Sequence, residues 1–316
     1  MGELIKVNAL KKYFPCGGKM LKAVDDVSFT LQPGETLGLV GESGSGKSTL
    51  GRAILRLHEP DGGHIFFEGE DLLKLSKEEL RIKRRYMQII FQDPLASLNP
   101  QMSIGHAIED PLIVHKLGSA HERKEKVDEL LEIVGIGSKF RNSFPYEFSG
   151  GQQQRVGIAR ALALNPKFIV CDEPVSALDV SIQAQIISLL IDLRERYNLT
   201  YLFIAHDLGV VKYVSNRVAV MYLGKIVQIG SKEEVFRNPL HPYTKAIISS
   251  VPKIPWDGKP IRRYKTLKGE IPSPIDLPPG CRFRSRCPVA KRVCAENEPE
   301  LREVASGHWV ACHLSS

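Results

Sequence analysis

The fold of this 316-residue chain follows from the stretch Gly41-Glu42-Ser43-Gly44-Ser45-Gly46-Lys47-Ser48-Thr49. Its first eight residues fit the pattern G-x-x-x-x-G-K-[ST] without a gap. A short apolar run over 36–40 precedes the stretch and predicts a strand, and residues 50–57 after it look helical. A strand, a glycine-rich loop and a helix in this order predict a phosphate-binding loop, because the glycines let backbone N–H groups turn toward phosphate oxygens.

Two side chains of this loop have specific expected roles. Lys47 would place a charge near the β- and γ-phosphates of a nucleotide, and the Ser48 hydroxyl would hold Mg²⁺. The alternative is a glycine-rich turn that binds nothing. The loop by itself indicates nucleotide binding only, because kinases, GTPases and motor proteins share it.

A second motif, residues 168–173, is an apolar run that ends in two carboxylates. Asp172 suits the coordination sphere of Mg²⁺, because hard cations prefer oxygen ligands. Glu173 follows it just beyond the expected strand, where it could orient or deprotonate a water that attacks a γ-phosphate. The alternative is a pair of solvated loop acids. The presence of the phosphate loop favours the functional interpretation.

Composition limits the possible classes of protein. Charged residues make up 25% and apolar residues 43%, as expected for a folded domain with a sizeable core, and the net charge is +7. This charge fits a mildly basic surface or contact with phosphates or acidic lipids. No apolar run approaches the roughly 20 residues of a membrane-spanning helix, and residues 1–6 lack a signal-peptide layout. Work at a membrane would therefore need a partner that spans it.

Periodicity predicts an α/β fold. Strands are expected at 168–171 and 201–205 with a helix over 181–197 between them, which implies a parallel sheet. Apolar residues at helical spacing predict a helix over 121–134, and a hairpin is expected at Leu223-Gly224-Lys225.

The same patterns divide the chain. We predict a nucleotide-binding domain over 1–236, with an antiparallel β region early in it and a helical subdomain inserted at about 93–150. After Asn238 prolines interrupt the chain repeatedly, so that 237–316 is predicted to be a small appended extension.

Residues 148–152, Phe-Ser-Gly-Gly-Gln, resemble the signature L-S-G-G-Q of the ABC ATPases, with Phe148 in place of leucine. The other ABC elements follow in the family's order. Gln92 resembles the Q-loop glutamine, 176–179 the D-loop and His206 the switch histidine, while Tyr13 resembles the aromatic residue that stacks on adenine. Phe14 competes with Tyr13 for that role, and Tyr13 could instead be a core residue.

The resemblance implies a P-loop NTPase (RecA-like) core that binds and hydrolyses ATP with Mg²⁺. Glu173 and His206 would be catalytic, the nine-residue loop with Tyr13 and Gln92 would bind ATP, and Ser48, Gln92 and Asp172 would hold Mg²⁺. It also implies a head-to-tail dimer, in which the ATP of a partner chain is met by Ser149, Gly150, Gly151, Gln152 and Asp179.

Finer resemblance is to ATPases of bacterial dipeptide and oligopeptide importers, and within them to the second, F-type, subunit. Its basis is the three stretches 87–100, 238–244 and 280–288. This implies a second ATPase subunit that is a different chain, with a homodimer in isolation as the alternative. It also implies two membrane permease subunits, an extracytoplasmic peptide-binding protein reached indirectly, and a peripheral location on the cytoplasmic face of the membrane. Importers of nickel, glutathione or oligosaccharides share most of these features.

A soluble ABC ATPase that acts on ribosomes or nucleic acid is the alternative from a different class. The net charge of +7 would suit it. The sequence, however, has one ATPase unit, no long heptads and no block of five basic residues, so we expect no nucleic-acid partner.

Four cysteines gather near the end of the chain, at Cys281, Cys287, Cys294 and Cys312, with five, six and seventeen residues between them. Disulfides, free buried thiols, a zinc site and an iron–sulfur cluster remain open. Zinc sites usually show paired C-x₂₋₄-C knuckles, which are absent here. Resemblance to cluster-bearing members of the importer group favours a [4Fe–4S] cluster, as a staple for a segment that buries little core.

Overall fold

We analysed a computed structural model of the chain, which describes residues 2–250, 269, 272–275 and 277–315. The structure divides into two units. The first contains the segments up to Ile5, Leu31–Thr36 and Phe66–Ile204, and the second contains Lys6–Thr30, Leu37–Ile65 and the described residues from Ala205 onward.

The first unit is built on three parallel strands, β6 (Met87–Ile90), β7 (Phe168–Asp172) and β8 (Thr200–Ile204). β7 lies between the other two, and its Val170 is opposite Ile89 of β6 and Leu202 of β8. Every residue of β7 and β8 is buried. Strands covered on both faces need such continuous apolar runs, and the expected parallel order is confirmed.

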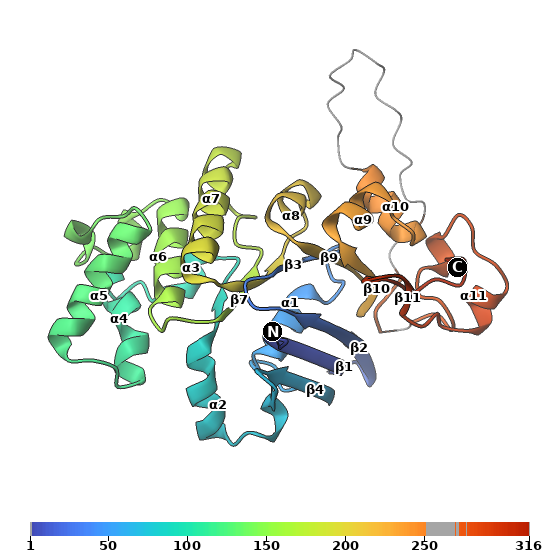
Figure 1. The fold of residues 1–316 in the computed structure, drawn as a ribbon, viewed down its shortest axis with the longest axis horizontal. Helices are drawn as coiled ribbons and strands as arrows, with labels where there is room; N and C mark the ends of the chain where they lie inside the picture. Colours follow the sequence, from blue (N-terminus) through green and yellow to red (C-terminus); the bar gives the residue numbers. More distant parts are fainter. Residues whose placement is uncertain (1, 251–268, 270–271, 276, 316) are drawn as a thin grey trace, which may run out of the picture. The chain divides into compact units, whose positions relative to one another are not determined.

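Helices make up most of the rest of the first unit. α3 (Pro94–Ser97), α4 (Ile104–Val114) and α5 (Ala120–Ile133) each contact α6 (Gly150–Leu162). Figure 1 shows α4, α5 and α6 in green. The other bounds are α2 (Lys77–Lys83) and α7 (Val180–Tyr197), with short 3-10 turns η1 (Leu72–Lys74), η2 (Arg84–Tyr86), η3 (Ser138–Phe140) and η4 (Pro145–Glu147). The short strand β5 (Glu70–Asp71) pairs with the end of β4 (Gly62–Phe67).

The second unit begins with three neighbouring strands. β1 (Ile5–Cys16) lies between β2 (Lys19–Leu31) and β4, and the three run side by side in Figure 1. β3 (Thr36–Val40) is fully buried and leads to α1 (Lys47–Ile54). This helix begins three residues earlier than the predicted residue 50 and ends at Ile54, so the loop runs directly into its first turn.

A second group of strands in this unit includes the hairpin predicted from the sequence. β3 pairs in parallel with β9 (Arg217–Tyr222), which pairs antiparallel with β10 (Lys225–Ser231). Tyr222 is opposite Lys225, and the two residues between them, Leu223 and Gly224, have φ values of 44° and 85°. A two-residue loop with both φ positive matches the twist of the flanking strands, so the hairpin prediction is confirmed.

The extension contributes strands that the sequence did not predict. Its strand β12 (His308–Val310) pairs antiparallel with β10, and β11 (Arg302–Ala305) pairs with β12. The extension therefore adds two strands to the sheet that contains β3. The sequence missed this because both strands are short, with three and four residues. The remaining elements are α8 (Leu208–Val214), α9 (Lys232–Arg237), α10 (Pro242–Ser249), η5 (Arg284–Arg286) and α11 (Val293–Glu296).

In the part of the chain that the structure describes, no helix combines the length and the apolar character required to cross a membrane.

Candidate nucleotide-binding site

The glycine-rich loop lies in the second unit, between β3 and α1. A Cβ at Gly41 would collide with the carbonyl oxygen of Met221, and one at Gly46 would collide with that of Ala23. Gly46 also has a φ of 103°, which L side chains rarely adopt. The loop therefore needs glycine at both ends for close packing, while Ser43 and Gly44 between them are exposed to solvent.

Lys47 is folded into this loop. Its ammonium group donates to the carbonyl oxygens of Gly41 at 2.9 Å and Glu42 at 3.0 Å, and its side chain is buried. The positive charge of Lys47 thus already lies within the loop. Phosphate oxygens could replace the two carbonyl oxygens as its hydrogen-bond acceptors. Ser48 and Thr49 follow in the first turn of α1 and are partly exposed.

Glu42 of the loop has two partners that the sequence did not predict. Its backbone N–H donates to the Tyr243 hydroxyl at 2.9 Å. The Arg286 guanidinium donates to both of its carboxylate oxygens, at 2.7 and 2.9 Å. Both partners lie in stretches quoted above for the importer resemblance, but neither was given a role, because no spacing rule connects positions more than 200 residues apart.

In the first unit, the strand ends bring two predicted residues together. Gln92 follows β6 and Glu173 follows the neighbouring parallel strand β7, so both lie at the carboxyl edge of the sheet. Gln92 Nε2 donates to Glu173 Oε2 at 3.1 Å. Glu173 has a φ of 49°, uncommon for a residue other than glycine, and its N–H donates to the Ile204 carbonyl oxygen at 3.0 Å. Asp172 is buried at the end of β7.

The signature residues of this unit begin α6, as expected. Ser149 is the N-cap, with a reciprocal capping box in which Gln152 N–H donates to Ser149 Oγ at 3.4 Å and Ser149 N–H donates to Gln152 Oε1 at 3.0 Å. Ser149, Gly150 and Gln152 are exposed, whereas Gly151 is buried against Ile182.

The D-loop aspartate of the same unit also faces solvent. Asp179 precedes α7 without capping it through its side chain, and it is exposed together with Val180.

His206 belongs to the second unit and is exposed. The preceding residue, Ala205, donates its N–H to the Leu39 carbonyl oxygen at 3.3 Å, next to the strand end from which the phosphate loop begins. Asp207 caps α8 by accepting the N–H groups of Gly209 and Val210. A capping role explains Asp207 without catalysis.

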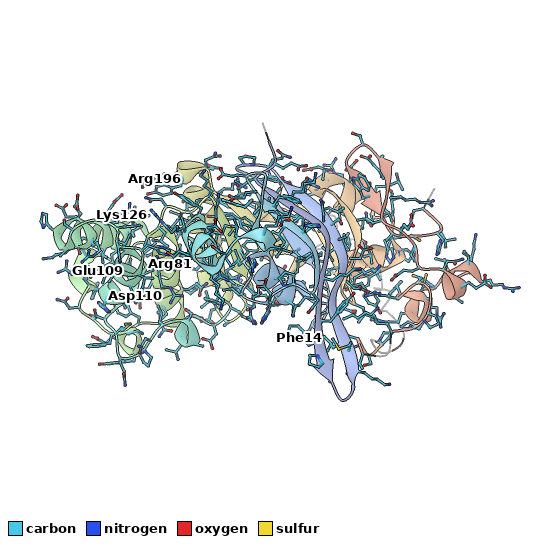
Figure 2. All side chains as sticks on the ribbon, turned by 90° about the horizontal axis from the view of Figure 1, so that it is seen from below. Phe14, Arg81, Glu109, Asp110, Lys126 and Arg196 are labelled. Atoms are coloured by element: carbon cyan, nitrogen blue, oxygen red, sulfur yellow. The ribbon has the colours of Figure 1, made fainter. Side chains whose placement is uncertain are left out.

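Tyr13 and Phe14 lie on β1, and both are partly exposed. Figure 2 labels Phe14 near the tip of the ribbon formed by β1 and β2. The Tyr13 hydroxyl donates to Asp25, and burial, together with this carboxylate, raises the pKa of Tyr13. The Phe14 ring meets His58 edge-on at 5.5 Å.

The four thiols of the extension lie within electrostatic reach of one another. Burial, with smaller effects of the neighbouring Cys294, Cys287 and Cys312, raises the pKa of Cys281 to about 11. Backbone N–H groups of Phe283, Val289 and Leu314 face the sulfurs of Cys281, Cys287 and Cys312. None of the six cysteines, all of which the structure describes, forms a disulfide. Across residues 2–250, 269, 272–275 and 277–315, no three His, Cys, Asp or Glu side chains converge on one ion.

Two protein families match parts of this chain. The family described as "ABC transporter" matches residues 24–176, and "Oligopeptide/dipeptide transporter, C-terminal region" matches residues 227–294. The oligopeptide transport ATP-binding protein AppF of Bacillus subtilis is 53% identical over 321 residues, covering 99% of this chain and 98% of AppF. The chain is an ABC transporter ATPase. The resemblance drawn from the motifs is confirmed, and with it the ATPase class.

Other relatives of this ABC ATPase agree. The dipeptide transport ATP-binding protein DppF of Haemophilus influenzae is 46% identical, covering 98% of this chain and 96% of DppF. Among solved structures, the dimeric ATP-binding cassette MJ0796 bound to ADP and phosphate has a TM-score of 0.65 at 32% identity, covering 72% of this chain and 98% of that chain. These neighbours are ATP-binding cassettes, so the expected α/β P-loop NTPase fold is confirmed.

Proposed function

We propose that this ABC ATPase binds and hydrolyses ATP to energise the import of dipeptides or oligopeptides through membrane permease subunits. The observation that carries this proposal is the extension, whose family match covers residues 227–294 and whose strand β12 continues the sheet from β10. The extension is thus part of the folded ATPase. We assign the nucleotide-binding domain to 1–236, with its helical subdomain at about 93–150, and the extension to 237–316.

We assign the nucleotide roles as the motifs predicted them. The loop from Gly41 to Thr49 would hold the phosphates, and Lys47 would exchange its two carbonyl acceptors for phosphate oxygens. Ser48, Gln92 and Asp172 supply hydroxyl, amide and carboxylate oxygens, the donor chemistry that Mg²⁺ prefers. When bound, Mg²⁺ would neutralise part of the phosphate charge.

The hydrolytic role goes to Glu173, which would orient the attacking water, with His206 near the γ-phosphate. The hydrogen bond between Glu173 and Gln92 supports this assignment, because a carboxylate that accepts from an amide donor has a fixed orientation.

A second ATPase chain would complete the site. Ser149, Gly150, Gln152 and Asp179 are exposed, and the capping box leaves the N-terminus of α6 ordered. An N-terminus of this kind favours an anion through its N–H groups and dipole. We propose that it acts on the ATP of the partner, a different ATPase chain in the assembled importer, and that the pair is held by two permease subunits at the cytoplasmic face of the membrane.

For the four thiols we propose a [4Fe–4S] cluster with a structural role, which would cross-link the extension. The donor set fits, because four thiols share one neighbourhood and backbone N–H groups face the sulfurs of three of them, where they would stabilise iron-bound thiolates. In such a cluster each iron takes one cysteine, so the sulfurs do not converge on a single ion as zinc would require.

The test is reconstitution. The chain, a second ATPase subunit and the permeases would be assembled in liposomes with the peptide-binding protein, and peptide uptake and ATP hydrolysis would be measured together. Peptide-stimulated hydrolysis with uptake supports the proposal. Stimulation by nickel, glutathione or oligosaccharides instead, or co-purification with ribosomes, would contradict it.

A further inference from the structure

The phosphate loop and the extension meet at one residue of the second unit, Glu42. Arg286 of η5 forms a two-pronged ion pair with its carboxylate, and Tyr243 of α10 accepts its backbone N–H. One residue of the loop is therefore held both through its side chain and through its backbone by the region that follows the hairpin.

Arg286 has little freedom to move away. Its side chain is 5% exposed, against 27% for Glu42. The aromatic rings of Tyr222, Tyr243 and Phe283 form a cluster with centroid distances of 4.6 to 5.4 Å. Arg286 contacts this cluster, because its Nη1 lies 3.4 Å from the Tyr222 hydroxyl. A planar guanidinium packed in this way stays next to the carboxylate, and its two N–H donors reach both carboxylate oxygens.

The position of Glu42 matters for the charge balance of the loop. Its carbonyl oxygen accepts one of the hydrogen bonds of Lys47, so the backbone that Tyr243 fixes also orients the lysine. Its carboxylate carries a negative charge next to the place proposed for a triphosphate, which would repel it. The two prongs of Arg286 neutralise that charge.

The segment that carries Arg286 is itself anchored. It runs from Cys281 to Cys287, and Arg282 at its other end donates to Asp25 of β2 and to the Leu223 carbonyl oxygen in the β9–β10 turn. Asp25 also accepts the hydroxyl of Tyr13. Both ends of this short segment are thus fixed to the ATPase fold.

We infer that Arg286 is a positioning residue for ATP binding in its own chain: it neutralises Glu42 so that the loop accepts the triphosphate, with Tyr243 fixing the backbone of the same residue. The inference rests on the proposed role of the phosphate loop. It gives the extension a function in nucleotide binding in addition to stapling the chain.

The test measures MgATP affinity of the full chain by equilibrium titration for Arg286→Gln, Glu42→Gln and the double variant. Arg286→Gln leaves an unpaired carboxylate beside the phosphates, and we expect about tenfold weaker binding, equal to about 1.4 kcal/mol. Glu42→Gln removes the carboxylate itself and is the reference against which the double variant is compared. The double variant should recover to within about twofold of Glu42→Gln, and Arg286→Lys should recover most of the loss.

Two controls separate this role from a general loss of structure. Arg292→Gln removes the same charge from a side chain that is 92% exposed in the same extension, and its affinity should not change. In Arg286→Gln the turnover at saturating ATP should stay within about twofold of the parent while the affinity falls.

Three results would overturn the inference. The first is unchanged affinity in Arg286→Gln with a lowered melting temperature, which would mean a structural role only. The second is a double variant that binds MgATP as weakly as Arg286→Gln does, which would exclude charge neutralisation. If Arg286→Gln does not fold, the affinities of the double variant and of Arg286→Lys still test the inference. The third is Lys47→Ala with parental affinity in the same assay, which would remove the phosphate loop assignment as well.

Discussion

Gln92 Nε2 lies 3.1 Å from Glu173 Oε2, so that the residues after two neighbouring parallel strands are joined by a side-chain hydrogen bond. Glu173 is kept there by its backbone, which has a positive φ and donates to Ile204 in β8. The relationship links the glutamine expected to hold Mg²⁺ with the carboxylate expected to orient water.

Glu173→Gln should keep ATP binding and nearly abolish hydrolysis, because the amide holds its place but cannot take a proton from water. We expect a loss of about 10²-fold or more in turnover. Phosphate release and ATP titration on the same preparation measure both effects. Parental turnover in this variant would refute the assignment.

Lys47→Ala should weaken ATP binding itself, by about tenfold or more, because a hydrogen bond from a charged donor contributes about 1.5–3 kcal/mol. Lys47 now donates to two loop carbonyls, so the variant also tests whether the loop keeps its shape. Equilibrium binding of ATP at fixed Mg²⁺ measures the loss, and a melting curve without nucleotide controls for unfolding.

Ser149→Arg should block coupled activity in the assembled transporter and spare ATP binding by the same chain. Ser149 is exposed at the start of α6, so an arginine there clashes with a partner chain and not with its own core. Uptake assays and ATP titration measure the two effects. Full coupled transport in this variant would exclude the head-to-tail arrangement.

Anaerobic purification should yield a coloured protein with about four irons and four sulfides per chain, because four cysteines ligate one [4Fe–4S] cluster. Metal and sulfide analysis with a visible spectrum tests this. A colourless, iron-free protein with one zinc per chain would contradict it. Cys287→Ser should lose the cluster and melt at a lower temperature, whereas Cys16→Ser, at an exposed cysteine at the end of β1, should change neither.

Stability should fall in acid because of His241. Burial lowers the pKa of this imidazole to about 3, from an ordinary value near 6.5. The unfolded chain therefore binds a proton that the folded chain excludes, and the free energy of unfolding falls as pH drops below about 6.5, by about 1.4 kcal/mol per pH unit until the folded pKa is reached. Denaturant unfolding at pH 7.5 and pH 5 measures this.

His241→Asn is the matched variant for that measurement. His241 Nδ1 accepts the N–H of Tyr243 at the start of α10, and asparagine is also a good cap. The variant should lose less stability than the parent between the two pH values. An equal loss in both proteins would assign the acid sensitivity to other groups.

The sequence by itself determined the elements with local causes. The glycine-rich loop requires its glycines, the unbroken apolar run 168–171 is typical of a buried strand, and Leu223-Gly224 is typical of a hairpin turn. Each depends on residues within a few positions of one another, so a pattern is sufficient to predict it.

Only the tertiary structure decided which distant residues meet. It joined Gln92 to Glu173, it placed Arg286 and Tyr243 next to Glu42, and it added the extension to the sheet through the pairing of β12 with β10. The physical reason is that these contacts depend on register and burial across more than 50 positions, where no local periodicity acts. The sequence around Arg286 does not indicate its ion-pair partner, because the carboxylate of Glu42 comes within reach only in the folded chain.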